Sequence, residues 1–430
     1  MKELIKKFIP AFILNWYHFL LAFLGAVLYR FPSRKLQVIG VTGTNGKTTV
    51  VHLTTRILEA AGHKIASLSG IKFKIGEKEW SNTLKMTMPG RFRIQKFLRQ
   101  AVNIGCQYAV LEVTSEGIKQ HRHKFINFAI AVFTNLSPEH IEAHRGFENY
   151  KKAKGKLFQT TRGVHVINLD DENAKYFLQF PADKKYGFTI SGSSTAMNID
   201  GSRTAIISAK EIQPLHLQLI GDFNIHNALA AICVGLSQNI DLATCKKAVE
   251  KVEGIPGRME EVISQPFKVF VDYAFTPNAL EKVYQTLTHQ LPKRSDGSRR
   301  DLSLRLINSS TNKLICVLGA CGGGRDKWKR PVLGKLAAKY CHEVIVTNED
   351  PYDENPMEII EQVAEGTMGK ARKILDRREA IRKSLELAKP GDVVVITGKG
   401  CEPWICVAKG KKIPWDDREI VKEEFAKLNL

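Results

Sequence analysis

A glycine-rich loop between an apolar run and a helical pattern is the stretch whose residue types most clearly indicate chemistry. The loop consists of Gly43, Thr44, Asn45, Gly46, Lys47, Thr48 and Thr49. Glycines let backbone N–H groups close on phosphate oxygens, and a following helix N-terminus adds positive potential. A lysine then reaches the terminal phosphates and a threonine hydroxyl reaches Mg²⁺. The sequence therefore predicts a nucleoside triphosphate site, the alternative being a Gly/Thr-rich turn that binds nothing.

Polar side chains also follow the two clearest buried-strand patterns, at residues 107–113 and 128–134. Glu112, Thr114 and Ser115 come at the end of the first pattern, and His140 follows the second. In doubly wound folds, ligands bind at the carboxyl ends of parallel strands. We therefore expect Glu112 and His140 to lie at the same edge as the glycine-rich loop, as metal ligands. The alternatives are a solvated strand end for Glu112 and a helix-start polar residue for His140.

A lysine in the apolar stripe of the helix expected at residues 147–158 is the third signal. At about 100° per residue, Lys154 falls in the middle of the face formed by Phe147, Tyr150 and Leu157. An ammonium is costly there, whereas a lysine carbamylated by CO₂ is an anion that can bind Mg²⁺. The alternative is that Lys154 reaches past the stripe to solvent.

These residues need two or more domains to position them. The chain has 430 residues, 43% of them apolar and 25% charged, which is typical of two or three globular domains. Strand and helix patterns alternate over residues 36–257 and predict a mainly parallel α/β sheet with a P-loop. Residues 258–430 predict a second, smaller Rossmann-like α/β domain, and residues 291–313 a flexible surface insertion.

The net charge of +20 is compatible with nucleic acid, an anionic membrane surface or a polyanionic substrate such as a nucleotide sugar. No nucleic-acid recognition module is visible, and we expect no nucleic-acid partner. The eight cysteines are scattered without a CxxC pair, which argues against a zinc ribbon or a redox dithiol. We interpret them as reduced thiols of a cytoplasmic protein.

Residues 1–35 form an apolar N-terminal segment that is expected to be helical. The apolar run at residues 8–31 is interrupted by Pro10, Asn15, His18 and Arg30 and flanked by basic residues. Its length permits a membrane span, and its aromatic and basic residues also suit a helix at the inner face of the plasma membrane. A third possibility is a helix packed on the enzyme's own surface.

Beyond these local signals, the sequence resembles the Mur ligases, most closely the MurE branch, from residue 35 to the C-terminus. The matching segments are residues 43–49, 111–115 (Leu-Glu-Val-Thr-Ser), 133–140 (Phe-Thr-Asn-Leu-Ser-Pro-Glu-His), 150–154 (Tyr-Lys-Lys-Ala-Lys), 221–231, 254–260, 272–277, 322–331, 376–381 and 398–402. The resemblance implies an ATP-dependent ligase that adds an amino acid to a UDP-MurNAc-peptide through an acyl phosphate, as a monomer.

The resemblance also implies roles for individual residues. It implies that Thr48, Glu112, His140 and carbamylated Lys154 bind Mg²⁺, with Lys47 beside them. Asn224 and Asn227 would contact adenine and Asp376 the ribose, although all three could also be helix caps. The residues expected to contact the peptide or the amino acid are Thr114, Ser115, Arg258, Arg325, Asp350 and Glu402.

The sequence departs from the family pattern at five points. The family's UDP-binding N-terminal domain has no counterpart before the loop, and Glu116, Phe275 and Cys401 stand where the family has histidine. Tyr352 replaces the arginine of the diaminopimelate-adding branch, so the added amino acid stays open. Two other functions remain: a ligase like folylpolyglutamate synthase, which shares the core, and a non-catalytic ATP-binding partner subunit.

Overall fold

The structure is a computed structural model that describes residues 10–84, 86–190, 192, 197–199, 202–212, 214–290 and 312–428. The chain divides into two compact units. The first comprises residues 1–138, 144–218 and 223–253, and the second comprises residues 139–143, 219–222 and 254–430. Most of the insertion expected at residues 291–313 lies outside the described residues, as do residues 1–9.

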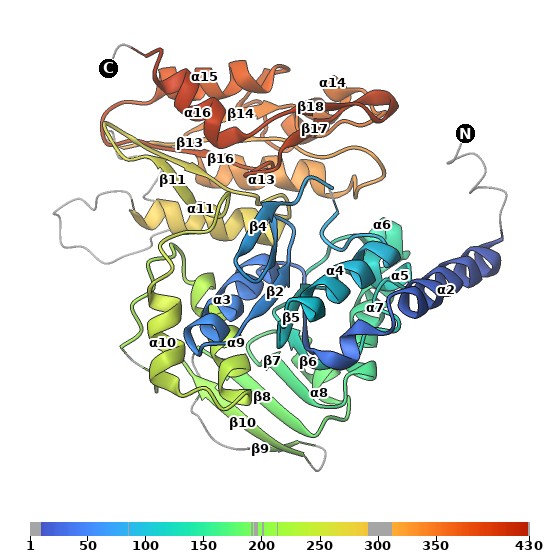
Figure 1. Ribbon diagram of the computed structural model, residues 1–430. Helices are drawn as coiled ribbons and strands as arrows, with labels where there is room; N and C mark the ends of the chain where they lie inside the picture. Colours follow the sequence, from blue (N-terminus) through green and yellow to red (C-terminus); the bar gives the residue numbers. More distant parts are fainter. Residues whose placement is uncertain are drawn as a thin grey trace. The chain divides into compact units, whose positions relative to one another are not determined.

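The first unit is built on a sheet with the strand order β4-β3-β2-β5-β1-β6-β7-β8-β10-β9 (Figure 1). Its strands are β1 (Gln37–Thr42), β2 (Ile65–Leu68), β3 (Lys72–Ile75), β4 (Lys78–Ser81), β5 (Tyr108–Glu112), β6 (Phe128–Phe133), β7 (Val164–Asn168), β8 (Lys184–Thr189), β9 (Met197–Ile199) and β10 (Ser202–Ser208). Neighbours from β2 to β10 pair in parallel, and the strands at both edges pair antiparallel. The predicted mainly parallel sheet is confirmed.

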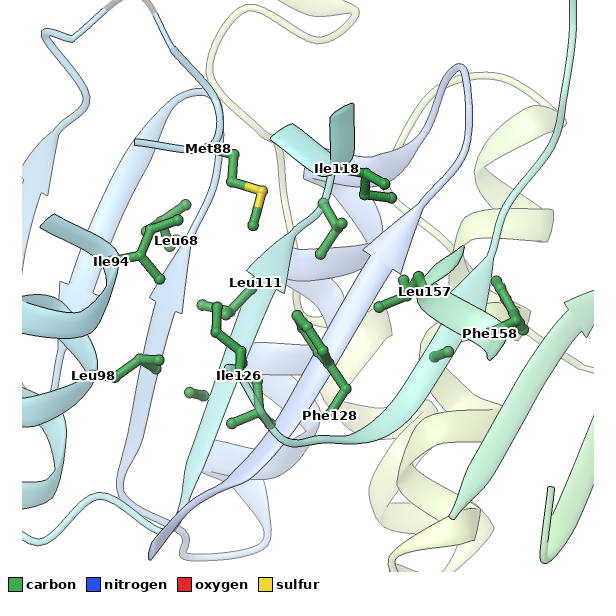
Figure 2. Packing of buried hydrophobic residues seen from close by; sticks show 14 of the residues in the cluster. Leu68, Met88, Ile94, Leu98, Leu111, Ile118, Ile126, Phe128, Leu157 and Phe158 are labelled. Carbon is green, nitrogen blue, oxygen red and sulfur yellow. The ribbon is translucent and has the colours of Figure 1, made fainter. Parts of the chain in front are cut away.

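Helices cover both faces of this sheet, so its central strands are buried on both sides. They are α3 (Lys47–Ala60), α4 (Arg91–Asn103), α5 (Ser115–Lys119), α7 (Phe147–Thr160), α8 (Ala174–Leu178), α9 (Phe223–Ser237) and α10 (Leu242–Glu250). Figure 2 shows Ile94 and Leu98 of α4 beside Leu68 and Leu111 of the strands. Because both faces are covered, β1 and β5 consist almost entirely of apolar residues rather than an alternating pattern.

One glycine decides how closely the layers approach. A Cβ at Gly40 of β1 would lie 2.9 Å from the ring of Phe128 and 3.1 Å from a methyl group of Leu157. Real side chains essentially never pack at such distances, so only glycine lets Phe128 and Leu157 meet over β1. This contact holds α7, which carries Lys154, against the strand that leads into the phosphate loop.

The second unit contains a smaller sheet with the strand order β11-β12-β16-β13-β14-β15, antiparallel only between β11 and β12. Its strands are β11 (Glu260–Ile263), β12 (Lys268–Val271), β13 (Leu314–Leu318), β14 (Glu343–Thr347), β15 (Ala371–Ile374) and β16 (Val393–Ile396), with a separate pair β17 (Trp404–Cys406) and β18 (Lys412–Pro414). Its helices are α11 (Pro277–Gln290), α13 (Lys329–Tyr340), α14 (Pro356–Glu365), α15 (Arg377–Leu387), α16 (Asp417–Phe425) and the 3₁₀ turn η2 (Ala408–Gly410). The predicted second α/β domain is confirmed.

The apolar N-terminal segment forms α2 (Ala11–Leu28), followed by the 3₁₀ turn η1 (Pro32–Lys35). Pro10 precedes the helix, and Arg30 and Phe31 end it with positive φ angles of 55° and 48°. Among the residues that the structure describes, no helix is long and apolar enough to cross a membrane.

Candidate active site

The phosphate loop joins β1 to α3 and depends on two glycines with positive φ. Gly43 has φ 154° and Gly46 has φ 81°, a conformation that favours glycine. A Cβ at Gly43 would collide with the hydroxyl of Thr134, and one at Gly46 with the amide oxygen of Asn227. The loop backbone is thus pressed against its neighbours, and side chains at these positions would push it away from a bound phosphate.

Residues after β6 hold the loop in place. Asn135 accepts a hydrogen bond from the Asn45 backbone N–H at 2.9 Å through its side chain and donates one to the Asn45 carbonyl at 3.0 Å. The Thr44 hydroxyl and the Tyr150 hydroxyl lie 3.0 Å apart. The loop is therefore preorganised from β6 and α7, which lowers the entropy lost on binding a triphosphate.

Glu112 and Thr48 meet at the loop, although they are 64 residues apart in the sequence. The Thr48 hydroxyl donates to Glu112 Oε2 at 2.8 Å, and the backbone N–H of Gly70 donates to the same oxygen at 2.9 Å. Lys47 Nζ lies 3.9 Å from Glu112 Oε1 and donates to the carbonyls of Gly43 and Thr44. A carboxylate, a hydroxyl and a lysine thus converge where the terminal phosphates of a nucleotide bind in P-loop proteins.

Lys154 reaches the same loop from α7. Its side chain is only 2% exposed, Nζ donates to the Gly43 carbonyl at 2.7 Å, and the ammonium lies 4.6 Å from the centre of the Tyr150 ring. Burial, reinforced by the nearby charge of Lys47, holds the pKa of Lys154 well below its usual value. The position on the apolar face that helical spacing predicted is confirmed, and of the two alternatives the structure favours burial, because Lys154 does not reach solvent.

The oxygen atoms of Thr48 and Glu112 fit a hard cation such as Mg²⁺, which prefers hydroxyl and carboxylate ligands. Lys154 would join them only after its amine had become a carbamate, because an ammonium donates and cannot coordinate. His140 belongs to the second compact unit, so its place in the metal site stays a prediction. Among the described residues, no group of three or more His, Cys, Asp or Glu side chains is arranged to hold a metal.

The other predicted residues of the first unit lie close to the ends of its helices. Asn224 and Asn227 occupy the first turn of α9, where Asn227 donates to the Asn224 side-chain oxygen at 2.9 Å and both are buried. The Thr114 side chain caps α5 by accepting from the Gly117 N–H at 3.0 Å, and Ser115 is buried beside it. Asn227 also faces Gly46, which brings the expected adenine contacts next to the phosphate loop.

In the second unit, a charge network joins two of the predicted residues. Lys399 Nζ lies 3.0 Å from both carboxylate oxygens of Asp350 and 2.7 Å from Glu402 Oε2. The Tyr273 hydroxyl donates to Glu402 Oε1 at 2.8 Å, and the Arg258 guanidinium lies 4.4 Å from the centre of the Tyr273 ring. Arg258, Asp350 and Glu402 are therefore members of one connected cluster.

Arg325 lies beside this cluster near Cys321, Tyr273 and Tyr352. Among the described residues, no hydrogen bond or ion pair holds its guanidinium. Cys321 donates through Sγ to Glu349 Oε1 at 2.8 Å, and burial raises the pKa of the Glu349 carboxyl. A guanidinium that no carboxylate contacts within ion-pair distance is a suitable group for an anionic ligand.

Asp376 caps α15, where its side chain accepts from the Glu379 N–H at 2.8 Å. The helix-cap interpretation of Asp376 is thus observed, and a contact with ribose stays a prediction. The cap geometries of α5 and α15 are both compatible with ligand binding at a helix N-terminus.

Three residues of these clusters were not singled out from the sequence. Tyr150 supports both Thr44 and Lys154, Lys399 joins Asp350 to Glu402, and Tyr273 joins Glu402 to Arg258. Tyr150, Tyr273 and Lys399 all lie within segments that were quoted for the family resemblance. The position of Lys399 between two glycines could have singled it out in the sequence. A lysine in a Gly-Lys-Gly turn is held close to both the backbone and a ligand.

Comparisons with known proteins agree with this arrangement. Two family models match the chain: the Mur ligase middle domain over residues 41–235 and the Mur ligase glutamate ligase domain over residues 302–400. The chain is 38% identical over 420 residues to a UDP-N-acetylmuramoyl-L-alanyl-D-glutamate–2,6-diaminopimelate ligase of Syntrophomonas wolfei, covering 94% of this chain and 81% of that protein. It is 33% identical to a UDP-N-acetylmuramyl-tripeptide synthetase of a Roseiflexus species, covering 95% and 82%.

Solved structures show the same relationship at the level of the fold. A UDP-N-acetylmuramoyl-L-alanyl-D-glutamate–2,6-diaminopimelate ligase structure has 29% identity, a TM-score of 0.54 and coverage of 91% of this chain and 78% of that one. A folylpolyglutamate synthase of Mycobacterium tuberculosis has a TM-score of 0.66 at 18% identity, covering 88% and 92%. The matched domains and the sequence identity over nearly the whole chain together show that this chain belongs to the Mur ligase family.

Proposed function

We propose that this protein is an ATP-dependent amide-bond ligase that adds an amino acid to a UDP-MurNAc-peptide or a related cell-wall precursor. The observation that carries the proposal is the convergence of Lys47, the Thr48–Glu112 pair and the buried Lys154 on one phosphate loop. The relatives named above act on UDP-MurNAc-peptides by their names, which supports this substrate class.

The reaction proceeds in two steps. The precursor carboxylate attacks the γ-phosphorus of ATP, which forms an acyl phosphate as ADP leaves. The amine of the incoming amino acid then attacks the acyl carbon, loses a proton and expels phosphate, which leaves an amide. Lys47 neutralises charge on the transferring phosphoryl group, and the backbone N–H groups of the loop hold the nucleotide phosphates.

Mg²⁺ would supply further neutralisation of phosphate charge when bound to Thr48, Glu112 and the carbamate of Lys154, with His140 as a fourth ligand. The environment of Lys154 supports the carbamate. Its pKa is lowered by burial and by Lys47, so more of the side chain is the neutral amine that reacts with CO₂. The resulting anion also relieves the repulsion between two ammonium groups that donate to the same Gly43 carbonyl.

The second unit would bind the incoming amino acid. We assign its carboxylate to the guanidinium of Arg325 and its amine-bearing end to the cluster of Asp350 and Glu402. Tyr352 occupies the position at which the diaminopimelate-adding branch has arginine, so a second carboxylate lacks a bidentate partner. Although several relatives are named diaminopimelate ligases, we expect this chain to prefer another amino acid.

We further propose that the enzyme acts as a monomer in the cytoplasm, in contact with the inner face of the plasma membrane through residues 8–31. Residues 8 and 9 lie outside the described residues, and α2 accounts for residues 11–28.

Phosphate release tests the function directly. Purified protein is incubated with ATP, Mg²⁺, UDP-MurNAc-dipeptide and a panel of amino acids, and the peptide product is identified by mass spectrometry. Phosphate release that requires both the dipeptide precursor and an amino acid is the expected result. No release with any amino acid, despite ATP binding, would instead indicate a non-catalytic subunit.

The second candidate function is a folylpolyglutamate synthase activity, favoured by the fold similarity to the Mycobacterium tuberculosis enzyme. At 18% identity this similarity concerns the fold alone. The same phosphate-release assay with a reduced folate and glutamate separates the two functions, because only the second candidate predicts turnover with the pterin substrate.

A further inference from the structure

The helix α2 contacts the rest of the first unit through a stripe of small and half-buried residues. Residues 14, 18, 21, 22, 25, 26 and 29 are the half-buried or buried positions, a spacing that places them on one helix face. Ala22 and Ala26 are 2% and 0% exposed, and the Cα of Gly25 faces the backbone of Arg91 and Phe92 on α4. Small residues let the two helices approach closely.

Polar and aromatic contacts hold α2 at several points along its length. Asn15 shares a hydrogen bond of 2.6 Å with His121, and Arg99 of α4 donates to the backbone carbonyls of Tyr29 and Arg30. The rings of Phe19 and Phe23 each lie edge-on to Phe125, at 5.2 and 5.5 Å between centroids. The helix therefore has one defined orientation on its own domain.

The opposite face of α2 consists of large apolar side chains that remain in contact with solvent. They are Phe12, Ile13, Trp16, Tyr17, Leu20, Leu24, Val27 and Leu28, with exposed fractions between 45% and 69%. An ordinary surface helix places its apolar stripe against the core and its polar residues outside. Here the packed face holds Leu14, His18, Leu21, Ala22, Gly25, Ala26 and Tyr29, and the outward face is also almost entirely apolar.

A contiguous apolar face of this size marks an interaction surface rather than a stable boundary with water. The charges around it indicate what covers it. No acidic residue occurs between Glu3 and Glu59, and Arg30, Arg34 and Lys35 are exposed at the C-terminal end of the helix. The neighbouring α4 exposes Phe92, Arg93 and Lys96.

A basic rim around an apolar face with Trp16 and Tyr17 complements an anionic lipid surface, where acyl chains accept the apolar residues and headgroups the cations. A second copy of the chain complements it less well, because its rim carries the same positive charge. The 18 residues of α2 favour a helix lying in the plane of the interface, with its small-residue stripe turned toward α4.

We propose that the outward face of α2, together with Phe92, Arg93 and Lys96 of α4, binds the surface of an anionic lipid bilayer. This proposal specifies the membrane contact included in the proposed function, and it does not depend on the ligase reaction. Large apolar residues on α2 enter the boundary between headgroups and acyl chains, and the basic residues contact anionic headgroups. The small-residue stripe stays on α4, so the first unit remains folded against its own helix when it binds.

Co-sedimentation of the full-length chain with lipid vesicles tests the proposal. One set of vesicles contains phosphatidylcholine and phosphatidylglycerol in about a 2:1 ratio, and the other contains phosphatidylcholine alone. We expect binding to the anionic vesicles that is about tenfold stronger than to the neutral ones and that weakens with added salt.

Variants separate the apolar face from the rest of the surface. The double change Leu20→Glu and Leu24→Glu should lower vesicle binding by about tenfold or more. Ile413→Glu on β18 is the control for an added carboxylate, because it places one glutamate at a residue of similar exposure, 48%, outside α2. Arg93→Gln with Lys96→Gln should weaken binding to anionic vesicles and leave the weaker binding to neutral ones unchanged.

Each outcome decides one part of the proposal. The proposal is overturned if the full-length protein stays in the supernatant with both vesicle types. It is also overturned if the Leu20→Glu, Leu24→Glu variant binds the vesicles as well as the unchanged protein does. A dimer in light scattering that this double variant dissociates, without vesicle binding, would assign the face to a second copy instead. Phosphate release with the soluble precursor is measured in parallel, so a failure of ligase activity is distinguished from a failure of membrane binding.

Discussion

Two buried lysines, one in each compact unit, have opposite electrostatic surroundings. Lys154 is 2% exposed and its ammonium contacts a carbonyl oxygen and the ring of Tyr150. Lys399 is fully buried and its ammonium contacts the carboxylates of Asp350 and Glu402. Both residues were placed by the fold near predicted site residues, yet only Lys399 has an ion-pair partner within hydrogen-bond distance.

The difference separates a structural cation from a reactive amine. A buried ammonium paired with carboxylates is stable as a cation, because the attraction offsets the loss of hydration. A buried ammonium without a carboxylate partner loses its hydration and gains little electrostatic attraction in exchange. Its neutral form or a modified form is therefore favoured. We therefore interpret Lys399 as the centre of a fixed network and Lys154 as a side chain whose chemistry can change.

Lys399→Met gives the largest expected effect on stability. The change leaves Asp350 and Glu402 without their shared cation, and we expect the free energy of unfolding of the second unit to fall by about 3–5 kcal/mol. Urea denaturation of the full chain measures the loss. Lys154→Met serves as the contrast, because it removes a cation that has no ion-pair partner and should not destabilise the first unit. Equal losses of unfolding free energy in the two variants would contradict the distinction between the two lysines.

Lys47→Ala tests the half-buried lysine of the phosphate loop, whose side chain is 15% exposed. Because Lys47 is the only cationic side chain within the loop, its loss should lower phosphate release by about 10²–10³-fold and weaken ATP binding. The measurement is turnover with both substrates together with ATP titration. Near-normal turnover would show that charge on the transferring phosphate is neutralised elsewhere.

Lys154→Ala should lower ligation by about 10²-fold or more while the protein stays folded, because the proposed carbamate would be lost as a magnesium ligand. High concentrations of a small carboxylic acid should restore part of the activity by supplying an anion at the same place. Lys156→Ala is the matched control, since Lys156 lies on the exposed side of the same helix. A Lys154→Ala enzyme as active as the Lys156→Ala enzyme would remove Lys154 from the site.

Tyr352→Arg sharpens the comparison in the second unit, where a new cation would join Lys399 and Arg325. The wild-type enzyme should use diaminopimelate poorly, and the variant should improve its kcat/KM for diaminopimelate relative to lysine by about tenfold. Competition assays with both amino acids give the ratio. A clear preference of the wild-type enzyme for diaminopimelate would refute the role given to residue 352.

The pH dependence of stability provides the smallest effect. The folded-state pKa of Lys154 lies below its unfolded value, so the unfolded chain binds more protons between the two values, and stability rises with pH in that window. In CO₂-free buffer, the wild-type protein should therefore gain stability relative to Lys154→Met as the pH is raised from about 7 to 9. A constant difference over this range would contradict the lowered pKa.

Local patterns in the sequence predicted much of the fold. The apolar runs ending at Thr42, Glu112 and Phe133 formed strands, and the helix expected over residues 147–158 formed α7, with Lys154 on its apolar face. These features depend on neighbouring residues, because strand and helix periodicities place side chains on faces that burial then selects. The phosphate loop could also be predicted from the sequence, because its glycines allow the backbone conformation that the loop itself needs.

Contacts across long stretches of chain were decided only by the tertiary structure. The bond between Thr48 and Glu112 depends on β1 pairing with β5, and the pair of Lys399 with Asp350 depends on loops that meet 49 residues apart. The sequence also left three possibilities for the apolar residues near the N-terminus. Helical spacing alone identifies which residues of α2 share a face, but only the packing against α4 decides that the face with Ala22, Gly25 and Ala26 lies inside.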